Sequence, residues 1–236
     1  VLVFVWMKVS HPGEKAFEAA LLEGAFVPAV GSVETILTSM FLHATWLHLG
    51  GNMLFLWIFG DNIEERRGAI GDLFAYLAVG IAATLIFGAF RGDSLRPLVG
   101  ASGAISGVQG LYFIACPRHR VKLFFWVIVY VNVVRINARW IMGIWFALQD
   151  GLPLLIDFDG GGQVAHLAHI GGLVSGLALM LLLKPFAPGL RAAELAELPR
   201  AQRYKGGHAR SRAYERHRRR DPYESGIRKR SRLDLE

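Results

Sequence analysis

The chain has 236 residues, of which 53% are hydrophobic, and a mean hydropathy of +0.36. A soluble domain of this size does not bury so much apolar material, so the composition excludes an ordinary soluble globular protein and indicates a membrane protein. The net charge is +7, and residues 187–236 supply all of the surplus, with 14 Lys and Arg against 7 Asp and Glu. The single cysteine, Cys116, excludes an intrachain disulfide.

Apolar and polar segments alternate along the chain. Residues 1–8 are apolar but too short to cross a bilayer core of about 30 Å, so we expect the remnant of a first transmembrane helix. Residues 9–47 have mixed polarity with Pro and Gly, which favours a partly helical loop at the membrane interface. Five hydrophobic stretches follow, at about 48–66, 70–90, 101–117, 121–149 and 164–184. The predicted fold is therefore an all-α polytopic membrane domain over residues 1–186, a six-helix bundle with its first helix truncated.

The basic residues predict the orientation of this bundle. Lys and Arg in short loops stay on the cytoplasmic side, and they follow the second, fourth and sixth predicted helices: Arg66, Arg67, Arg118, Arg120, Lys122 and Lys184. Both termini are then cytoplasmic, in what we expect to be a bacterial inner membrane. The basic tail, residues 187–236, is poor in aliphatic residues and is expected to be disordered and to face anionic lipid, because no motif supports nucleic-acid binding.

A serine opens the fourth predicted helix among small residues, in the run Gly100-Ala101-Ser102-Gly103. The four-residue spacing of Gly103 and Gly107 is also the ordinary pattern for close helix packing in lipid, so the motif by itself is weak. The last predicted helix carries His166 and His169 in an apolar span, followed by Gly172 and Gly176. Intramembrane histidines are costly and are therefore candidates for function. The two glycine faces predict close contact between the fourth and sixth helices.

Depth in the membrane connects three polar residues. Ser102 lies 15 residues before Pro117, His169 lies 15 before Lys184, and Asn52 lies 14 before Arg66. At 1.5 Å per residue, all three lie about 21–22 Å from the cytoplasmic face. His48 shares a helical face with Asn52, although both residues would also serve as plain interhelical hydrogen-bonding groups.

Side chains of this kind at one depth predict a serine hydrolase. A serine hydroxyl needs a neighbouring base, for which we choose His169 over His166 because Gly172 and Gly176 share its face. Asn52, His48 and the Ser102 amide are the candidate donors for the oxyanion. We find no carboxylate at this depth, so a Ser–His dyad is expected, and no cofactor. No carboxylate or thiol is arranged to join the two histidines, so no metal site is predicted.

Taken together, the residues resemble the rhomboid family of intramembrane proteases from Phe26 to Lys184. Three segments carry the resemblance: His48 to Asn52 with Gly60, Glu64 and Gly68; Gly100, Ser102 and Gly103; and Ala168, His169, Gly172 and Gly176. The resemblance implies Ser102 as nucleophile, His169 as base and cleavage of single-span membrane proteins near the outer face. It further implies a movable cap over residues 152–162 and a lateral gate at the fifth helix. Ser106 stands where the family often has an aromatic residue packing on the histidine, which leaves the support of the His169 ring open.

Two alternatives remain at this point. An inactive rhomboid relative that binds transmembrane clients would use the same fold, although it would not need Ser102 or His169. A transporter or channel would use His48, His166 and His169 as a polar lining, but it leaves the glycine-flanked serine and the common depth unexplained.

Overall fold

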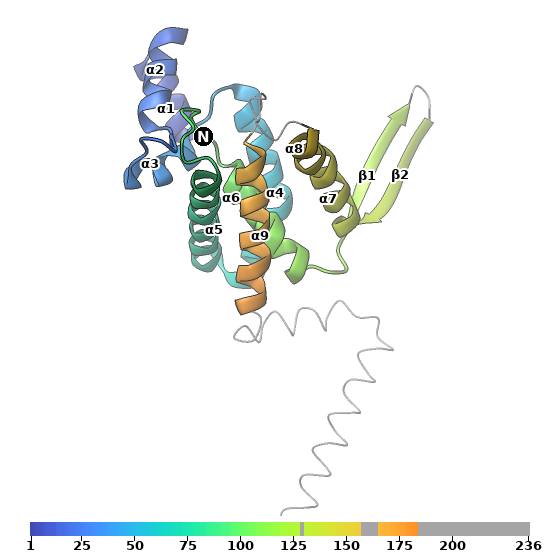
Figure 1. The fold of residues 1–236 in the computed structure, drawn as a ribbon. Coiled ribbons are helices and arrows are strands. Elements are labelled where there is room, and N and C mark those ends of the chain that lie inside the picture. The colour runs from blue at the N-terminus through green and yellow to red at the C-terminus, as the bar shows by residue number, and fades with distance from the viewer. Residues whose placement is uncertain (128–129, 157–164, 184–236) are drawn as a thin grey trace, which may run out of the picture. The chain divides into compact units, whose positions relative to one another are not determined.

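The computed structural model describes residues 1–127, 130–156 and 165–183, and Figure 1 shows the order of their elements. The N-terminal part holds α1 (Leu2–Ser10), α2 (Glu14–Gly24), α3 (Val33–Thr38) and the 3₁₀ helix η1 (Ser39–Phe41). Three helices follow: α4 (Trp46–Arg67), α5 (Ala69–Phe90) and α6 (Ser102–Ala115). The C-terminal part holds β1 (Arg120–Val127), β2 (Tyr130–Asn137), α7 (Ala138–Phe146), the π-helical η2 (Ala147–Gly151), α8 (Leu152–Ile156) and α9 (His166–Leu183).

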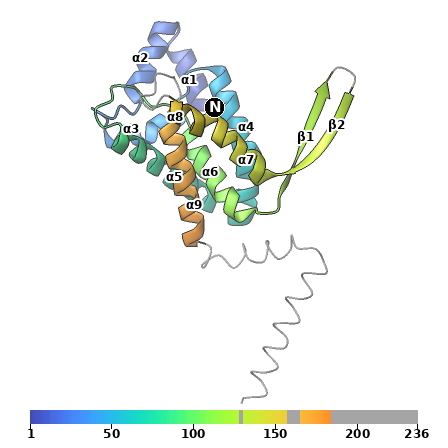
Figure 2. The same ribbon diagram turned by 45° about the vertical axis from the view of Figure 1, so that its right-hand side comes forward.

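Helix α6 is the centre of the bundle and contacts α4, α5 and α9 (Figure 2). Its contact with α9 is the most extensive between any two elements of the described chain. Nearly all of α6 after its first turn is buried, and the core on that side is completed by side chains of α4, α5, α7 and α9: Phe59, Ile63, Ala75, Met142 and Met180. The central position of α6 fixes Ser102, its first residue, against three neighbouring helices.

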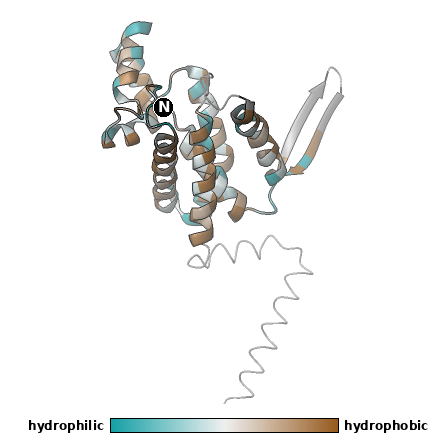
Figure 3. Cartoon of the chain, in the orientation of Figure 1, coloured by the Kyte–Doolittle hydropathy of each residue, from teal (hydrophilic) through white to brown (hydrophobic). Residues whose placement is uncertain are grey.

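Two helices among the described residues, α5 and α9, are long and apolar enough to cross a membrane. Figure 3 shows α5 in the hydrophobic colour along most of its length. Helix α4 is equally long, with 22 residues, but its mean hydropathy is reduced by polar residues, among them His48 and Asn52. Helix α6 has 14 residues, about 21 Å. The six-helix count and the truncated first helix therefore stay predictions.

The predicted helix over residues 121–149 is wrong in its first half. Residues 120–137 form an antiparallel pair, β1 and β2, in which Arg120 lies opposite Asn137 and Val127 opposite Tyr130. This stretch is rich in Val, Ile, Phe and Tyr, and an uninterrupted apolar run of such residues fits a strand as well as a helix. Helical structure begins only at Ala138, where the Asn137 side chain accepts a hydrogen bond from the Arg139 amide at 3.0 Å.

From Ala138 the helical segment runs through α7, η2 and α8 to Ile156. These residues span about 28 Å, because each residue of a helix adds about 1.5 Å. The segment therefore extends past the predicted end at residue 149 and includes Asp150. It also takes up residues 152–156 of the predicted cap, while residues 157–162 of that cap and the predicted tail lie outside the described residues.

The N-terminal segments pack over the end of the bundle at which α4 begins. Phe4 of α1 and Phe17 of α2 join Leu49 of α4 in a separate apolar cluster. The Ser39 carbonyl accepts a hydrogen bond from the Gly100 amide at 2.8 Å. This bond ties the residue before Ala101 and Ser102 to η1, so the predicted interfacial loop holds the start of α6 in place.

Candidate active site

Ser102 is the first residue of α6, and the turn before it is built on glycine. Gly100 has a φ of +118°, a conformation that side chains other than glycine rarely adopt. A Cβ on Gly100 would also lie only 2.7 Å from the His48 ring. As the first helical residue, Ser102 has a backbone N–H without a carbonyl partner in its own helix. The hydroxyl and a free amide therefore occupy the same point at the end of α6.

Glycines bring the backbone of α9 against that of α6. A Cβ on Gly172 would overlap the carbonyl oxygen of Gly103, and one on Gly176 would overlap that of Gly107. The close contact predicted from the glycine spacing is therefore present. Because His169 lies one turn before Gly172, the same contact carries its ring to the start of α6.

The two predicted catalytic side chains meet. His169 Nε2 lies 2.8 Å from Ser102 Oγ, within hydrogen-bonding distance. His169 is 8% exposed and Ser102 is half-buried, so the pair is shielded but still reachable. His166, the competing base, does not contact Ser102, because its Nδ1 is bonded to another residue described below. The geometry favours His169 as the base.

Asn52 lies in the second turn of α4 and is buried. Its Nδ2 has no hydrogen-bond partner, which is costly for a buried amide. Asn52 and Ser102 line the same cavity, so this free donor faces the space beside the serine. His48 packs against Gly100 instead and is not among the described residues that line this cavity. Asn52 therefore fits the predicted oxyanion role more directly than His48.

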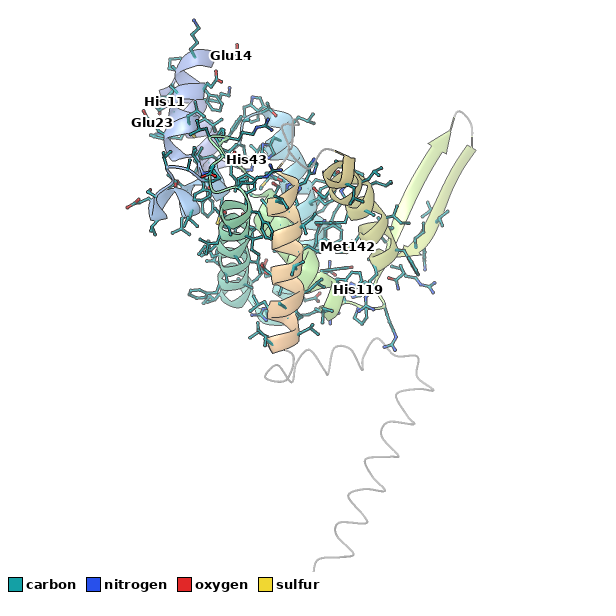
Figure 4. The ribbon with its side chains drawn as sticks, viewed as in Figure 1. His11, Glu14, Glu23, His43, His119 and Met142 are labelled. Atoms are coloured by element: carbon teal, nitrogen blue, oxygen red, sulfur yellow. The ribbon has the colours of Figure 1, made fainter. Side chains whose placement is uncertain are left out.

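His43 lies just outside the bundle, where Figure 4 labels it at the opposite end from His119. Its ring makes an edge contact with His48 at 5.2 Å, and its Nε2 is buried without a partner. Burial, and next the neighbouring His48, lower the pKa of His43 to about 4. His43 is therefore neutral near pH 7 and adds no charge beside the site.

A cavity of about 70 Å³ joins these groups. It is large enough for two or three water molecules, since each occupies about 30 Å³ of the liquid. Its lining combines the polar residues of α4, α6 and α9 with aromatic side chains of α4 and α7: Asn52, Phe55, Ser102, Ile105, Ser106, Gln109, Trp145, Phe146, Gln149, Asp150 and His169. The serine thus opens onto a small, partly polar space inside an apolar bundle.

The expectation that no carboxylate lies at this depth is wrong. Asp150 of η2 is 3% exposed, and its Oδ1 lies 2.7 Å from His169 Nδ1 and 3.0 Å from His166 Nδ1. The sequence did not reveal it because the predicted fifth helix ended at residue 149, one position before this carboxylate. An aspartate at the end of a predicted transmembrane segment, facing a segment with two histidines, was the available signal.

The same cluster corrects the expectation that no third ligand joins the two histidines. One atom each of Asp150, His166 and His169 lies within 4.8 Å of the others, a spacing at which two imidazoles and a carboxylate can share a metal ion. The hydrogen bonds from the two rings to Asp150 Oδ1 already account for this spacing.

Comparison with known families agrees with this architecture. The family model described as Rhomboid domain matches residues 30–186, well over half of the chain. The chain belongs to the rhomboid family. As a rhomboid protein it belongs to a family of integral membrane proteins that includes serine proteases.

Individual relatives are more distant. The chain is 32% identical over 152 residues to Rhomboid-like protein 11, chloroplastic, of Arabidopsis thaliana, covering 63% of this chain and 52% of that protein. It is 28% identical over 153 residues to Rhomboid protein 1, mitochondrial, of Saccharomyces cerevisiae, covering 63% and 41%. It is 25% identical over 150 residues to the human Presenilin-associated rhomboid-like protein, mitochondrial, covering 60% and 36%.

The matched region is thus about half or less of these curated relatives' own length. Their names place them in chloroplasts and mitochondria, so the comparisons do not support the expected bacterial inner membrane.

Proposed function

We propose that this rhomboid protein is a serine endopeptidase that hydrolyses peptide bonds in or near transmembrane segments of other membrane proteins. The observation that carries the proposal is the 2.8 Å approach of His169 Nε2 to Ser102 Oγ, on a cavity that also contains the unpartnered amide of Asn52. A base, a nucleophile and a free donor at one point are the groups that acyl transfer requires.

In the first half of the reaction, Ser102 Oγ attacks the carbonyl carbon of the scissile bond while His169 Nε2 takes the hydroxyl proton. The negative charge moves onto the carbonyl oxygen, where the Asn52 amide and the Ser102 N–H donate hydrogen bonds. His169 then gives its proton to the leaving nitrogen, the C–N bond breaks, and an ester to Ser102 remains. A water molecule, deprotonated by His169, hydrolyses that ester and regenerates the hydroxyl.

The proposed substrates are single-span membrane proteins, because the site is embedded in a bundle that shares its apolar surroundings with lipid. The Phe55 and Trp145 rings, from α4 and α7, lie 5.8 Å apart beside the cavity. Trp145 is 46% exposed, so this ring pair stands between the cavity and the outer surface of the bundle. We place substrate entry here, and the proposed opening of the site on the outer side follows from the positive-inside pattern.

The test is cleavage of a labelled panel of single-span proteins by the purified protein in liposomes. Ser102→Ala and His169→Ala are expected to abolish cleavage while their thermal unfolding stays close to that of the parent. Ser175→Ala is the matched control, because the Ser175 hydroxyl donates only to Gly171 of its own helix. Cleavage that survives Ser102→Ala would refute the proposal, and a folded parent that binds but never cuts would favour the inactive client-binding alternative.

A further inference from the structure

We propose that Asp150 is a positioning residue that completes a Ser102–His169–Asp150 array, and that His166 holds the Asp150 carboxylate in place. The inference rests on the proposed function and deepens it. The predicted dyad leaves the His169 ring supported only through Nε2, whereas the structure gives its other nitrogen a buried partner at 2.7 Å.

The carboxylate determines which nitrogen of His169 carries the proton. An ionised carboxylate only accepts hydrogen bonds, so the 2.7 Å contact requires the proton on Nδ1. Nε2 is then free to accept the hydroxyl proton of Ser102 at 2.8 Å. Without Asp150 the ring can adopt the other tautomer, in which Nε2 carries the proton and cannot act as a base. Asp150 therefore selects the reactive form of His169.

His166 gives the same carboxylate oxygen a second donor. Its Nδ1 lies 3.0 Å from Asp150 Oδ1, and its side chain is 14% exposed against 4% for that of Asp150. Within the described residues, these two histidines are the ion-pair partners of Asp150. A buried carboxylate is stable only with such donors. His166 thus acts through Asp150 rather than on the substrate.

The backbone around Asp150 is unusual in the way that such a role requires. Asp150 lies in η2, a π-helical segment between α7 and α8 that contacts α9. Single π-helical turns insert a residue into a helix and often occur at functional sites. Here the turn is in contact with the helix that carries both histidines.

The chemistry makes the carboxylate useful during the reaction as well as before it. When His169 takes the Ser102 proton it becomes an imidazolium in a bundle with few other charges nearby. Asp150 is already bonded to the opposite nitrogen, so the new positive charge forms next to a negative one. No group needs to move, because both hydrogen bonds exist before the proton is transferred.

The experiment measures kcat and KM for Asp150→Asn, Asp150→Ala and His166→Gln with one cleaved single-span substrate in liposomes. We expect kcat to fall at least about tenfold in Asp150→Asn, toward the roughly 10⁴-fold loss that this change causes in a soluble Ser–His–Asp hydrolase. KM should stay within about twofold. Asp93→Asn, in an exposed turn, is the matched control for the same chemical change. A purely structural Asp150 would tolerate the isosteric amide, so unchanged kcat in Asp150→Asn overturns the inference.

A double-mutant comparison tests the part played by His166. If His166 acts only through Asp150, His166→Gln lowers kcat in the parent but costs nothing further in Asp150→Asn. Equal losses in both backgrounds would overturn that part. Loss of parent activity on chelation, restored by Zn²⁺, would assign the cluster to a metal ion instead and overturn the positioning role.

One readout does not depend on activity and so separates the two proposals. Nitrogen-15 spectra of histidine-labelled protein in detergent are expected to show the proton of neutral His169 on Nδ1 in the parent and a mixture of tautomers in Asp150→Ala. If the parent shows this tautomer but cleaves nothing, the protease proposal fails and the hydrogen-bonded array stands. If the parent cleaves and His169 carries its proton on Nε2, the array fails and the protease proposal stands.

Discussion

Replacing Gly172 by alanine tests whether the contact between α6 and α9 sets the catalytic distance. A Cβ at this position would overlap the carbonyl oxygen of Gly103, which is backbone and cannot swing aside as a flexible side chain would. The two helices must then separate. His169 lies one turn before Gly172, so the separation is transmitted directly to its ring.

The size of the effect follows from the geometry. A separation of about 1 Å would relieve most of the overlap, and it would stretch the 2.8 Å bond between His169 and Ser102 beyond hydrogen-bonding range. A misplacement of about 1 Å costs on the order of 10²-fold in rate. Overpacking costs about 1–3 kcal/mol of stability, partly offset by the better helix propensity of alanine.

The assay is kcat for a single-span substrate beside thermal unfolding of the same preparation. Gly71→Ala is the matched control, because a Cβ there would meet only Arg67 Cβ at an ordinary 3.5 Å. We expect Gly71→Ala to match the parent or exceed it in stability, with unchanged kcat. If Gly172→Ala cleaves and unfolds like Gly71→Ala, the close backbone contact does not set the catalytic distance.

Three further predictions concern the neighbourhood of the site. Asn52→Ala should lower kcat by about 10²-fold with little change in KM, since it removes one oxyanion donor; an unchanged kcat would exclude Asn52 from that role. Thr45 caps α4 by accepting a hydrogen bond from the His48 amide at 3.0 Å, so Thr45→Ala should cost about 1 kcal/mol in denaturant unfolding, and a change near zero would contradict the capping role. The pKa of His43 is about 4 in the folded protein against 6.5 in the unfolded chain, so protons favour unfolding and stability should fall as pH drops from 6.5 toward 4. His43→Gln should weaken this dependence in thermal unfolding, and parallel curves for the two proteins would refute it.

The meeting of Ser102 and His169 follows from information that the sequence contains. Hydropathy marks the apolar segments, and counting 1.5 Å per residue from the cytoplasmic ends puts both residues at one depth. The glycine spacing then indicates which helix faces touch. These steps need only local periodicity and length, which survive without knowledge of how the loops run.

The features that sequence reasoning missed depend on other information. Apolar residues rich in Val and Phe fit either a strand or a helix, so hydropathy could not separate β1 and β2 from a fifth helix. That error moved the helical segment and left Asp150 outside it. The hydrogen bonds of Asp150 also depend on the π-helical turn and on how this segment lies against α9, and a single sequence fixes neither.

The most direct measurement of the central claim is covalent labelling with a fluorophosphonate probe, which reacts with activated serines, followed by mass spectrometry of the modified peptide. Labelling of the folded protein at Ser102, lost in His169→Ala and kept in Ser175→Ala, is the predicted result. Equal labelling of Ser102 in His169→Ala, or a label on another serine while Ser102 stays unmodified, would contradict the assignment of Ser102 and His169 as nucleophile and base.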